Sequence, residues 1–162
     1  MAPTVSFWDT GEFIATSHIL GVPHPPGSPL FLLIGKFFTL IPISSDIAFR
    51  FNIFSPIISA LTVSLLFLIC NQFINRVDMD DEAKFFKMWS SLTASLTFAF
   101  THSHWFNAVE TEVYAFSGFM TALVVYLIML WSKNIEKDNH IIYLNIIAYI
   151  IGLATGLHLL NL

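Results

Sequence analysis

The sequence is poor in charged residues, and this shortage excludes an ordinary soluble domain. Only 11% of the 162 residues are charged, whereas 56% are hydrophobic, and an average soluble domain carries about 25% charged residues. The mean hydropathy is +0.72. So few polar groups cannot cover a water-exposed surface of this size, so much of the apolar surface must face lipid.

Other absences exclude further classes. The single cysteine, Cys70, lies in an apolar run, so there is no disulfide framework, and the redox compartment cannot be inferred. The Lys and Arg residues are not clustered and the net charge is -4, which argues against a nucleic-acid partner. Residues 1–7 lack the basic and apolar regions of a cleavable signal peptide.

Four long stretches contain no Asp, Glu, Lys or Arg. A bilayer core of roughly 30 Å requires about 20 apolar residues in a helix, and the stretches that satisfy this are 53–74, 88–109, 113–132 and 141–162. Short polar segments, 75–87 and 133–140, connect them. The sequence therefore predicts an all-α, polytopic membrane helix bundle with the lipid bilayer as its main partner.

The distribution of cations predicts the orientation of these spans. Five of the seven Lys and Arg residues fall in the two polar connections, at positions 76, 84, 87, 133 and 137. Lys36 and Arg50 are the other two. Because positive residues are retained on the cytoplasmic side, we expect residues 1–52 and the turn at 106–113 to be extracytoplasmic.

Residues 1–52 form more than a simple loop. Residues 8–20 can form a short amphipathic helix, and the proline-rich segment 22–29 ends it. Residues 29–41 are apolar but too short to span, which is typical of an interfacial or re-entrant helix. Ser44 or Ser45 is expected to cap the next helix, with Asp46 at its positive end. We expect the chain to be part of a longer protein with at least one further helix before residue 1.

Two pairs of acidic residues are predicted to lie on the extracytoplasmic side. Asp9 and Glu12 share one face of a helix, and Glu110 and Glu112 lie in the turn between the second and third spans. Acids near a low-dielectric boundary lose hydration and repel one another, a cost often tolerated for catalysis or cation binding. The alternative is that each pair consists of solvated surface residues.

Histidines show the same bias toward the predicted outer side. Five of the six map there: His18, His24, His102, His104 and His158. His102 and His104 are two residues apart and cannot both point one way on a helix, so they are a weak metal pair. His158 could line a cavity with the acids or hydrogen-bond a neighbouring helix. Tyr114 lies near a span end, where interfacial aromatics are common.

Three sequence blocks resemble a known family. Residues 2–15 (APTVSFWDTGEFIA) with 21–30 (GVPHPPGSPL), residues 107–115 (NAVETEVYA) and, more loosely, residues 152–160 (GLATGLHLL) are similar to patterns of the DUF2723 family. That family includes protein O-mannosyltransferases of the transmembrane protein 260 type. It resembles the GT-C class of membrane glycosyltransferases, which take a sugar from a polyprenyl-phosphate carrier.

The resemblance implies roles for individual residues. It places the essential acid of the first extracytoplasmic loop at Asp9, beside Glu12, and makes both catalytic candidates. Substrate-binding candidates come from the same blocks and from outer-side cations: His24, Glu110, Glu112, Tyr114, His158, Lys36 and Arg50.

The implied reaction is an inverting transfer of a sugar, mannose by this resemblance, to a Ser or Thr hydroxyl of a protein acceptor. Asp9 would take the hydroxyl proton, and Glu12 and Glu110 would orient the acceptor or sugar hydroxyls. Lys36 or Arg50 would bind the leaving phosphate, although both fit equally well as snorkelling residues. No cofactor is certain. Four acids could hold a divalent metal, but their spacing does not require one.

Two rival functions remain open at this point. A transporter segment could use outward acids to bind cations, but it would be expected to carry acids within its spans. A non-catalytic membrane scaffold would tolerate replacement of Asp9 or Glu12. The same orientation rule applies to the endoplasmic reticulum membrane of a eukaryote and to a bacterial inner membrane. We expect the 162 residues alone to be inactive.

Overall fold

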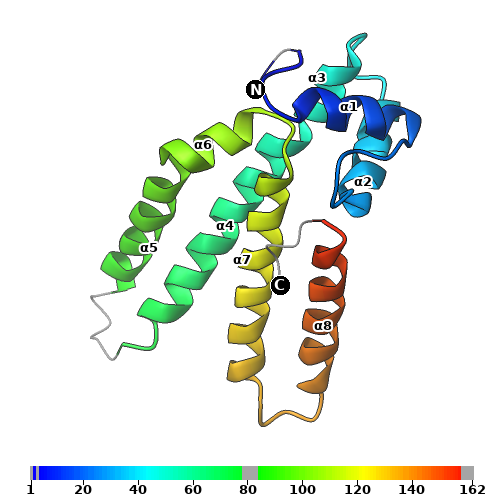
Figure 1. The fold of residues 1–162 in the computed structure, drawn as a ribbon. Coiled ribbons are helices and arrows are strands. Elements are labelled where there is room, and N and C mark those ends of the chain that lie inside the picture. Colours follow the sequence, from blue (N-terminus) through cyan, green and yellow to red (C-terminus); the bar gives the residue numbers. More distant parts are fainter. Residues whose placement is uncertain (1, 3, 78–83, 158–162) are drawn as a thin grey trace.

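A cluster of short helices packs on one end of a set of long helices in the computed structural model, which describes residues 2, 4–77 and 84–157 (Figure 1). All regular secondary structure in these residues is helical, which confirms the all-α prediction. The elements are α1 (Thr10–Ile19), α2 (Pro29–Leu40), α3 (Ile47–Asn52), α4 (Phe54–Ile74), α5 (Lys84–Ala99), α6 (His102–Val109), α7 (Val113–Lys133) and α8 (Ile141–Thr155).

Within the described residues, two helices are long and apolar enough to cross a membrane. One is the run Ile47–Ile74, which joins α3 and α4, and the other is α7. Helix α4 packs against both α5 and α7, and α7 also packs against α8. These two helices coincide with the predicted spans 53–74 and 113–132.

The other two predicted spans have a different form. The segment 88–109 is divided into α5 and α6 at Thr101, which has extended backbone angles and whose hydroxyl donates to the carbonyl of Phe98 at 2.8 Å. Such local bonding by Thr competes with helix continuation. Helix α8 has only 15 residues, and residues 158–162 lie outside the described part. A bundle of four spans therefore stays a prediction.

An aromatic core joins the short helices to the long ones. The ring of Phe31 from α2 lies 5.3 Å from Phe13, 5.1 Å from Phe51 and 6.1 Å from Phe54, between ring centres. Phe54 in turn lies 5.3 Å from Phe116 of α7. Phe31 and Phe51 are completely buried. These contacts fix the short helices rigidly on the end of α4 and α7.

The helices expected over 8–20 and 29–41 are α1 and α2, and the Pro-rich segment between them is not helical. The expected cap of the following helix was wrong in detail. Asp46 itself is the N-cap of α3, because its side chain accepts from the backbone N–H of Ala48 at 2.8 Å. Ser44 instead accepts from the backbone N–H of Asp46 at 3.1 Å.

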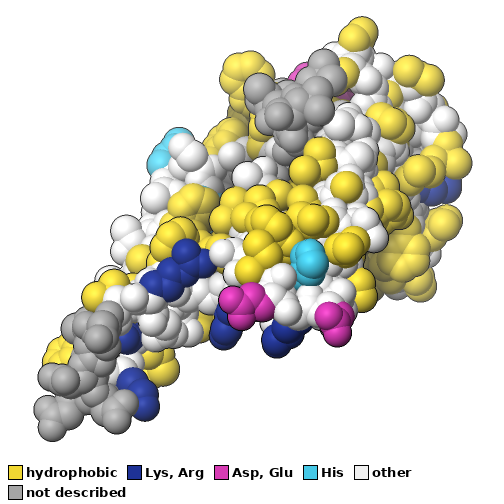
Figure 2. Space-filling view, turned by 90° about the horizontal axis from the view of Figure 1, so that it is seen from below, with side chains coloured by type: hydrophobic (Ala, Val, Ile, Leu, Met, Phe, Trp, Pro, Cys, Tyr) yellow, Lys and Arg dark blue, Asp and Glu magenta, His cyan; other side chains and the backbone are white. Residues whose placement is uncertain are grey.

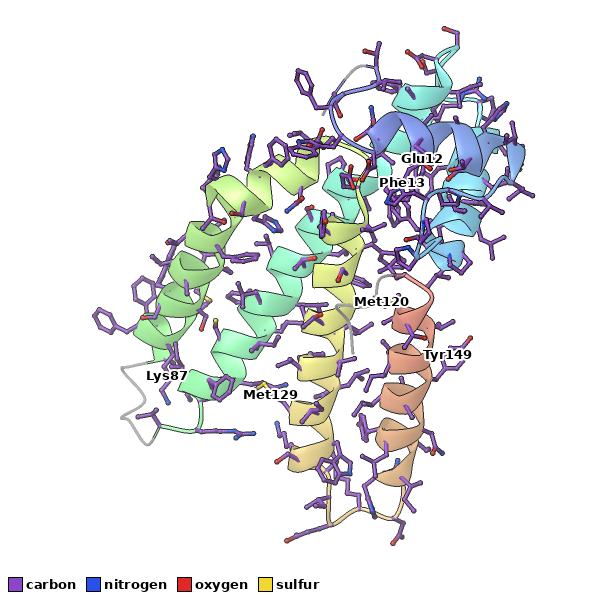
Figure 3. All side chains as sticks on the ribbon, in the orientation of Figure 1. Glu12, Phe13, Lys87, Met120, Met129 and Tyr149 are labelled. Carbon is purple, nitrogen blue, oxygen red and sulfur yellow. The ribbon has the colours of Figure 1, made fainter. Side chains whose placement is uncertain are left out.

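The cation-bearing connections lie at the opposite end of the long helices from α1, α2 and α3 (Figure 1). Glu12 and Lys87 mark these two ends in Figure 3. Figure 2 views the Lys87 end and shows Lys and Arg side chains around a central area of hydrophobic ones. The two predicted acidic pairs therefore lie at the end away from these connections, although Glu136 and Asp138 lie in the α7–α8 connection itself.

Candidate active site

The segment between α6 and α7 contains two buried carboxylates. Glu110 and Glu112 are 3% and 6% exposed, and Thr111 between them is completely buried. Both glutamates have extended backbone angles, so the chain runs straight from α6 to α7 here and does not form a tight turn. They are therefore not the solvated surface residues of the alternative interpretation.

The N-terminal segment lies directly beside these acids. The backbone N–H of Ala2 donates to the carbonyl of Val109 at 2.6 Å, and the hydroxyl of Ser6 donates to Oε2 of Glu110 at 2.5 Å. This segment leads into Asp9, which is the N-cap of α1. Residues separated by a hundred positions in the sequence thus meet at one end of the bundle.

A cavity of about 490 Å³ opens where the two segments meet. Its lining combines aromatic rings with polar and acidic side chains: Trp8, Asp9, His102, Ser103, Phe106, Asn107, Glu110, Glu112 and Tyr114. Asp9 is about half exposed. The cavity therefore offers one accessible carboxylate next to two buried ones, together with the rings that a sugar or lipid headgroup can pack against.

Burial and like charges change the acidity of Glu112. Burial, followed by the charges of Asp9 and Glu110, raises the pKa of the Glu112 carboxyl to about 7, although hydrogen bonds from the backbone of Asp9 and Val113 oppose the shift. Oε1 of Glu110 and Oε1 of Glu112 are buried and receive no hydrogen bond within the described residues. Glu112 is therefore suited to carry a proton near neutral pH.

His24 pairs with Glu12 beside Asp9, and neither of the two is among the side chains that line the cavity. Nδ1 of His24 lies 2.8 Å from Oε2 of Glu12, and the backbone N–H of His24 donates to Oε1 of Glu12 at 2.7 Å. The hydrogen bond raises the pKa of His24 and lowers the pKa of Glu12. Nε2 of His24 is 3.7 Å from Oδ2 of Asp9, so a protonated His24 places positive charge beside the accessible carboxylate.

The same three side chains could also hold a metal ion. One ligand atom each from Asp9, Glu12 and His24 lie within 4.8 Å of one another, and all three residues are exposed. Carboxylate oxygens and imidazole nitrogens are ligands for several divalent ions. Both oxygens of Glu12 interact with His24, so a metal ion would have to displace these hydrogen bonds.

Comparison with known proteins shows which family the chain belongs to. The family described as protein O-mannosyl-transferase TMEM260 N-terminal domain matches residues 9–162. The chain belongs to this family.

Two curated relatives of the TMEM260 family resemble the chain at modest identity. Protein O-mannosyl-transferase tmem260 of Dictyostelium discoideum is 28% identical over 127 residues, or 77% of this chain and 14% of the relative. Protein O-mannosyl-transferase TMEM260 of Mus musculus is 30% identical over 154 residues, or 94% of this chain and 20% of the relative. The chain thus spans a fifth or less of the length of these relatives. No solved structure matches it.

Two of the substrate-binding candidates lie away from the cavity. Nζ of Lys36 donates to the carbonyl of His18 at 2.5 Å. Arg50 donates from Nε to the carbonyl of Ser44 at 2.6 Å and from Nη1 to that of Thr39 at 2.9 Å. Both cations therefore join the backbones of α1, α2 and α3, and their assignment to a phosphate stays a prediction. His158 lies outside the described residues.

Sequence reasoning missed the polar residues that hold this site together. Asn52 is completely buried and contacts both the N-terminal segment and Thr111. The sequence did contain one signal: Asn52 and Arg50 are the only polar residues in the apolar run Ala48–Phe54. A polar side chain that is buried in such a run must be hydrogen-bonded. Its partners, however, could not be read from the sequence.

Proposed function

We propose that this chain contributes the acidic half of the active site of a membrane protein O-mannosyltransferase. The observation that carries the proposal is the cavity that brings the accessible Asp9 together with the buried Glu110 and Glu112. Membership of the TMEM260 family and the names of the two relatives support the same activity.

The proposed reaction moves mannose from a polyprenyl-phosphate donor to a Ser or Thr hydroxyl of a protein, in the manner of GT-C enzymes. Asp9 takes the hydroxyl proton while the hydroxyl oxygen forms a bond to the anomeric carbon. The bond from that carbon to the phosphate oxygen breaks on the opposite face, and the lipid phosphate leaves with the electron pair. The anomeric configuration is therefore inverted. Asp9 suits the role of base because its carboxyl is about half exposed and lines the cavity.

The neighbouring residues have complementary roles in this proposal. Glu112 carries a proton near neutral pH, so it donates a hydrogen bond to a sugar or phosphate oxygen and adds no further negative charge. Glu110, held by Ser6, orients a sugar hydroxyl. Tyr114 lines the part of the cavity that receives the lipid-linked donor. Protonated His24, oriented by Glu12, stabilises the charge that develops on the leaving phosphate.

The location follows from the predicted orientation of the helices. The α6–α7 connection and the start of α1, which carry residues that line the cavity, lie at the end away from the cationic connections (Figure 1), and positive residues favour the cytoplasmic side. The reaction would therefore take place on the luminal face of an endoplasmic reticulum membrane in a eukaryote, or on the outer face of a bacterial inner membrane.

Substitution of Asp9 tests this proposal. The Asp9→Asn variant of the natural protein should transfer mannose from polyprenyl-phosphate mannose to an acceptor protein at least about 100-fold more slowly, because general-base catalysis contributes that much or more. The Asp138→Asn variant, at the opposite end of the bundle, should retain the wild-type rate. Equal rates for Asp9→Asn and wild type, at matched protein levels, would remove Asp9 as the base.

A further inference from the structure

Two buried polar side chains connect the segments that carry the acids. Asn52 belongs to α3, and its side chain lies between the N-terminal segment and the α6–α7 connection. We infer that Asn52 and Thr111 are positioning residues, which hold Asp9 at the working distance from Glu110 and Glu112. The functional part of this inference rests on the function proposed above.

The hydrogen bonds of Asn52 use its whole amide group. Nδ2 donates to the carbonyls of Ala2 and Thr4, each at 2.9 Å. Oδ1 accepts a hydrogen bond from the hydroxyl of Thr111. Asn52 and Thr111 are both completely buried. Since an unpaired polar group is costly in such surroundings, each bond constrains the segment at its other end.

The two segments that these hydrogen bonds constrain are the ones that carry the acidic side chains of the cavity. Thr4 lies five residues before Asp9, and Thr111 lies between the two buried glutamates. Asn52 is itself fixed, because the neighbouring Phe51 is completely buried in the aromatic core against Phe31. A single side chain on a rigid helix therefore sets the position of both acidic segments at once.

A purely structural role would satisfy the same hydrogen bonds, so the test must separate stability from positioning. The Thr111→Val variant keeps the shape of the side chain and removes the donated hydrogen bond. The Thr111→Ser variant keeps the hydroxyl. The matched control is Thr97→Val in α5, because the hydroxyl of Thr97 is exposed and bonds only the carbonyl of Thr93 in its own helix at 2.8 Å.

Kinetics of the natural protein in lipid nanodiscs provide the first measurement. With polyprenyl-phosphate mannose as donor, Thr111→Val should lower kcat about 10- to 100-fold, since a small displacement of catalytic groups has effects of this size. KM for the donor should change little. Thr111→Ser should restore most of the rate, and Thr97→Val should match wild type. A loss of rate that Thr111→Ser does not restore would contradict the positioning role.

The pH profile adds a readout that stability alone would not change. The titratable groups around Glu112 are Asp9, Glu110 and His24, and His102 and Tyr114 line the same cavity. If Thr111→Val lets the Asp9 segment move away, the apparent pKa assigned to Glu112 should fall, because one neighbouring negative charge is lost. An unchanged profile in a variant with reduced kcat would contradict the inference.

Hydrogen exchange decides the structural part without any need for activity. Thr111→Val should accelerate amide exchange in residues 2–8 and 109–112, while α4 and α7 exchange as in wild type. Unchanged exchange in both segments would overturn the inference. If wild type shows these protection patterns but transfers no mannose, the proposed function fails while the structural connection stands. If Thr111→Val does not fold, Thr111→Ala gives the same comparison.

Discussion

The two ends of the helix bundle are held together in different ways. At the end formed by α1, α2 and α3, hydrogen bonds join residues far apart in the sequence, such as Ser6 with Glu110 and Asn52 with Thr111. At the opposite end, the hydrogen bonds seen among the described residues have a shorter range, and Lys87 donates to the carbonyl of Val77 only ten positions away at 2.9 Å. Asn134 donates to the carbonyl of Leu130 at 2.7 Å, and a ring nitrogen of His140 lies 2.8 Å from the carbonyl of Lys137.

This difference indicates which end needs a defined geometry. Local hydrogen bonds are sufficient to turn the chain between antiparallel helices. Long-range hydrogen bonds between buried polar groups fix the relative positions of separate segments. Loss of one partner leaves the other buried and unpaired, which is costly in free energy. The acidic end should therefore respond strongly to small substitutions, and the cationic end should tolerate them.

A single added methyl group should have the largest effect on stability at the close contact of α2 with α1 and α3. A Cβ atom at Gly35 of α2 would lie 2.4 Å from Cζ of Phe51 and 2.5 Å from Oγ of Ser17. Gly35→Ala should therefore destabilise the protein by about 1–3 kcal/mol through overpacking. Thermal unfolding in detergent would measure this change.

Gly152 of α8 provides the matched control for Gly35. A Cβ atom there meets nothing within 4 Å, so Gly152→Ala should leave stability unchanged or raise it by up to about 1 kcal/mol, because Ala favours the helix. If both variants had the same unfolding temperature as wild type, the close packing of α1, α2 and α3 would be disproved.

Neutralising Glu112 should change how stability depends on pH. Its pKa is raised to about 7 in the folded protein, from 4.5, so the folded state binds more protons than the unfolded state between these values. The free energy of unfolding should therefore fall as the pH rises from about 4.5 to about 7. Glu112→Gln cannot titrate and should show a flatter dependence.

Thermal unfolding at about pH 4 and about pH 8 would measure this effect, since the two values lie on either side of the transition. Glu136→Gln is the control, because Glu136 is exposed in the connection between α7 and α8. A wild-type pH dependence in Glu112→Gln would show that Glu112 does not carry the raised pKa.

Removal of His24 should have a smaller effect, since the side chain is exposed. Its pKa is raised by the hydrogen bond to Glu12, so its positive charge persists at low pH and is lost as the pH rises through that raised value. His24→Gln should raise KM for the lipid-linked donor roughly two- to fivefold, the range expected for exposed charge pairs. The effect should disappear at high pH. A larger effect at high pH than at low pH would contradict this role.

Chelation should produce the smallest change. Both oxygens of Glu12 interact with His24, so we expect mannose transfer to continue in the presence of EDTA. The measurement compares initial rates before and after dialysis against the chelator. A loss of activity that Mn²⁺ or Mg²⁺ restores would instead identify Asp9, Glu12 and His24 as a metal site.

The helices and the meeting of the acids could be predicted from the sequence, because they depend on simple patterns. Apolar runs indicated α4 and α7, and counting spans placed Glu110 on the same side as Asp9. The break at Thr101 could not be predicted, since residues 88–109 contain neither Gly nor Pro to mark it. The partners of Asn52 and the backbone contacts of Lys36 could not be predicted either, because tertiary packing decides which distant carbonyl lies within reach.

The central claim is that the Asp9 segment and the α6–α7 connection face one cavity. The most direct measurement is cross-linking of Trp8→Cys with Phe106→Cys by a short bis-maleimide in membranes, with Cys70 replaced by Ala and the linked peptides identified by mass spectrometry. The account predicts an efficient cross-link for this pair and none for Trp8→Cys with Lys87→Cys. Failure of the first pair, with both cysteines reactive toward a monofunctional maleimide, would contradict the account.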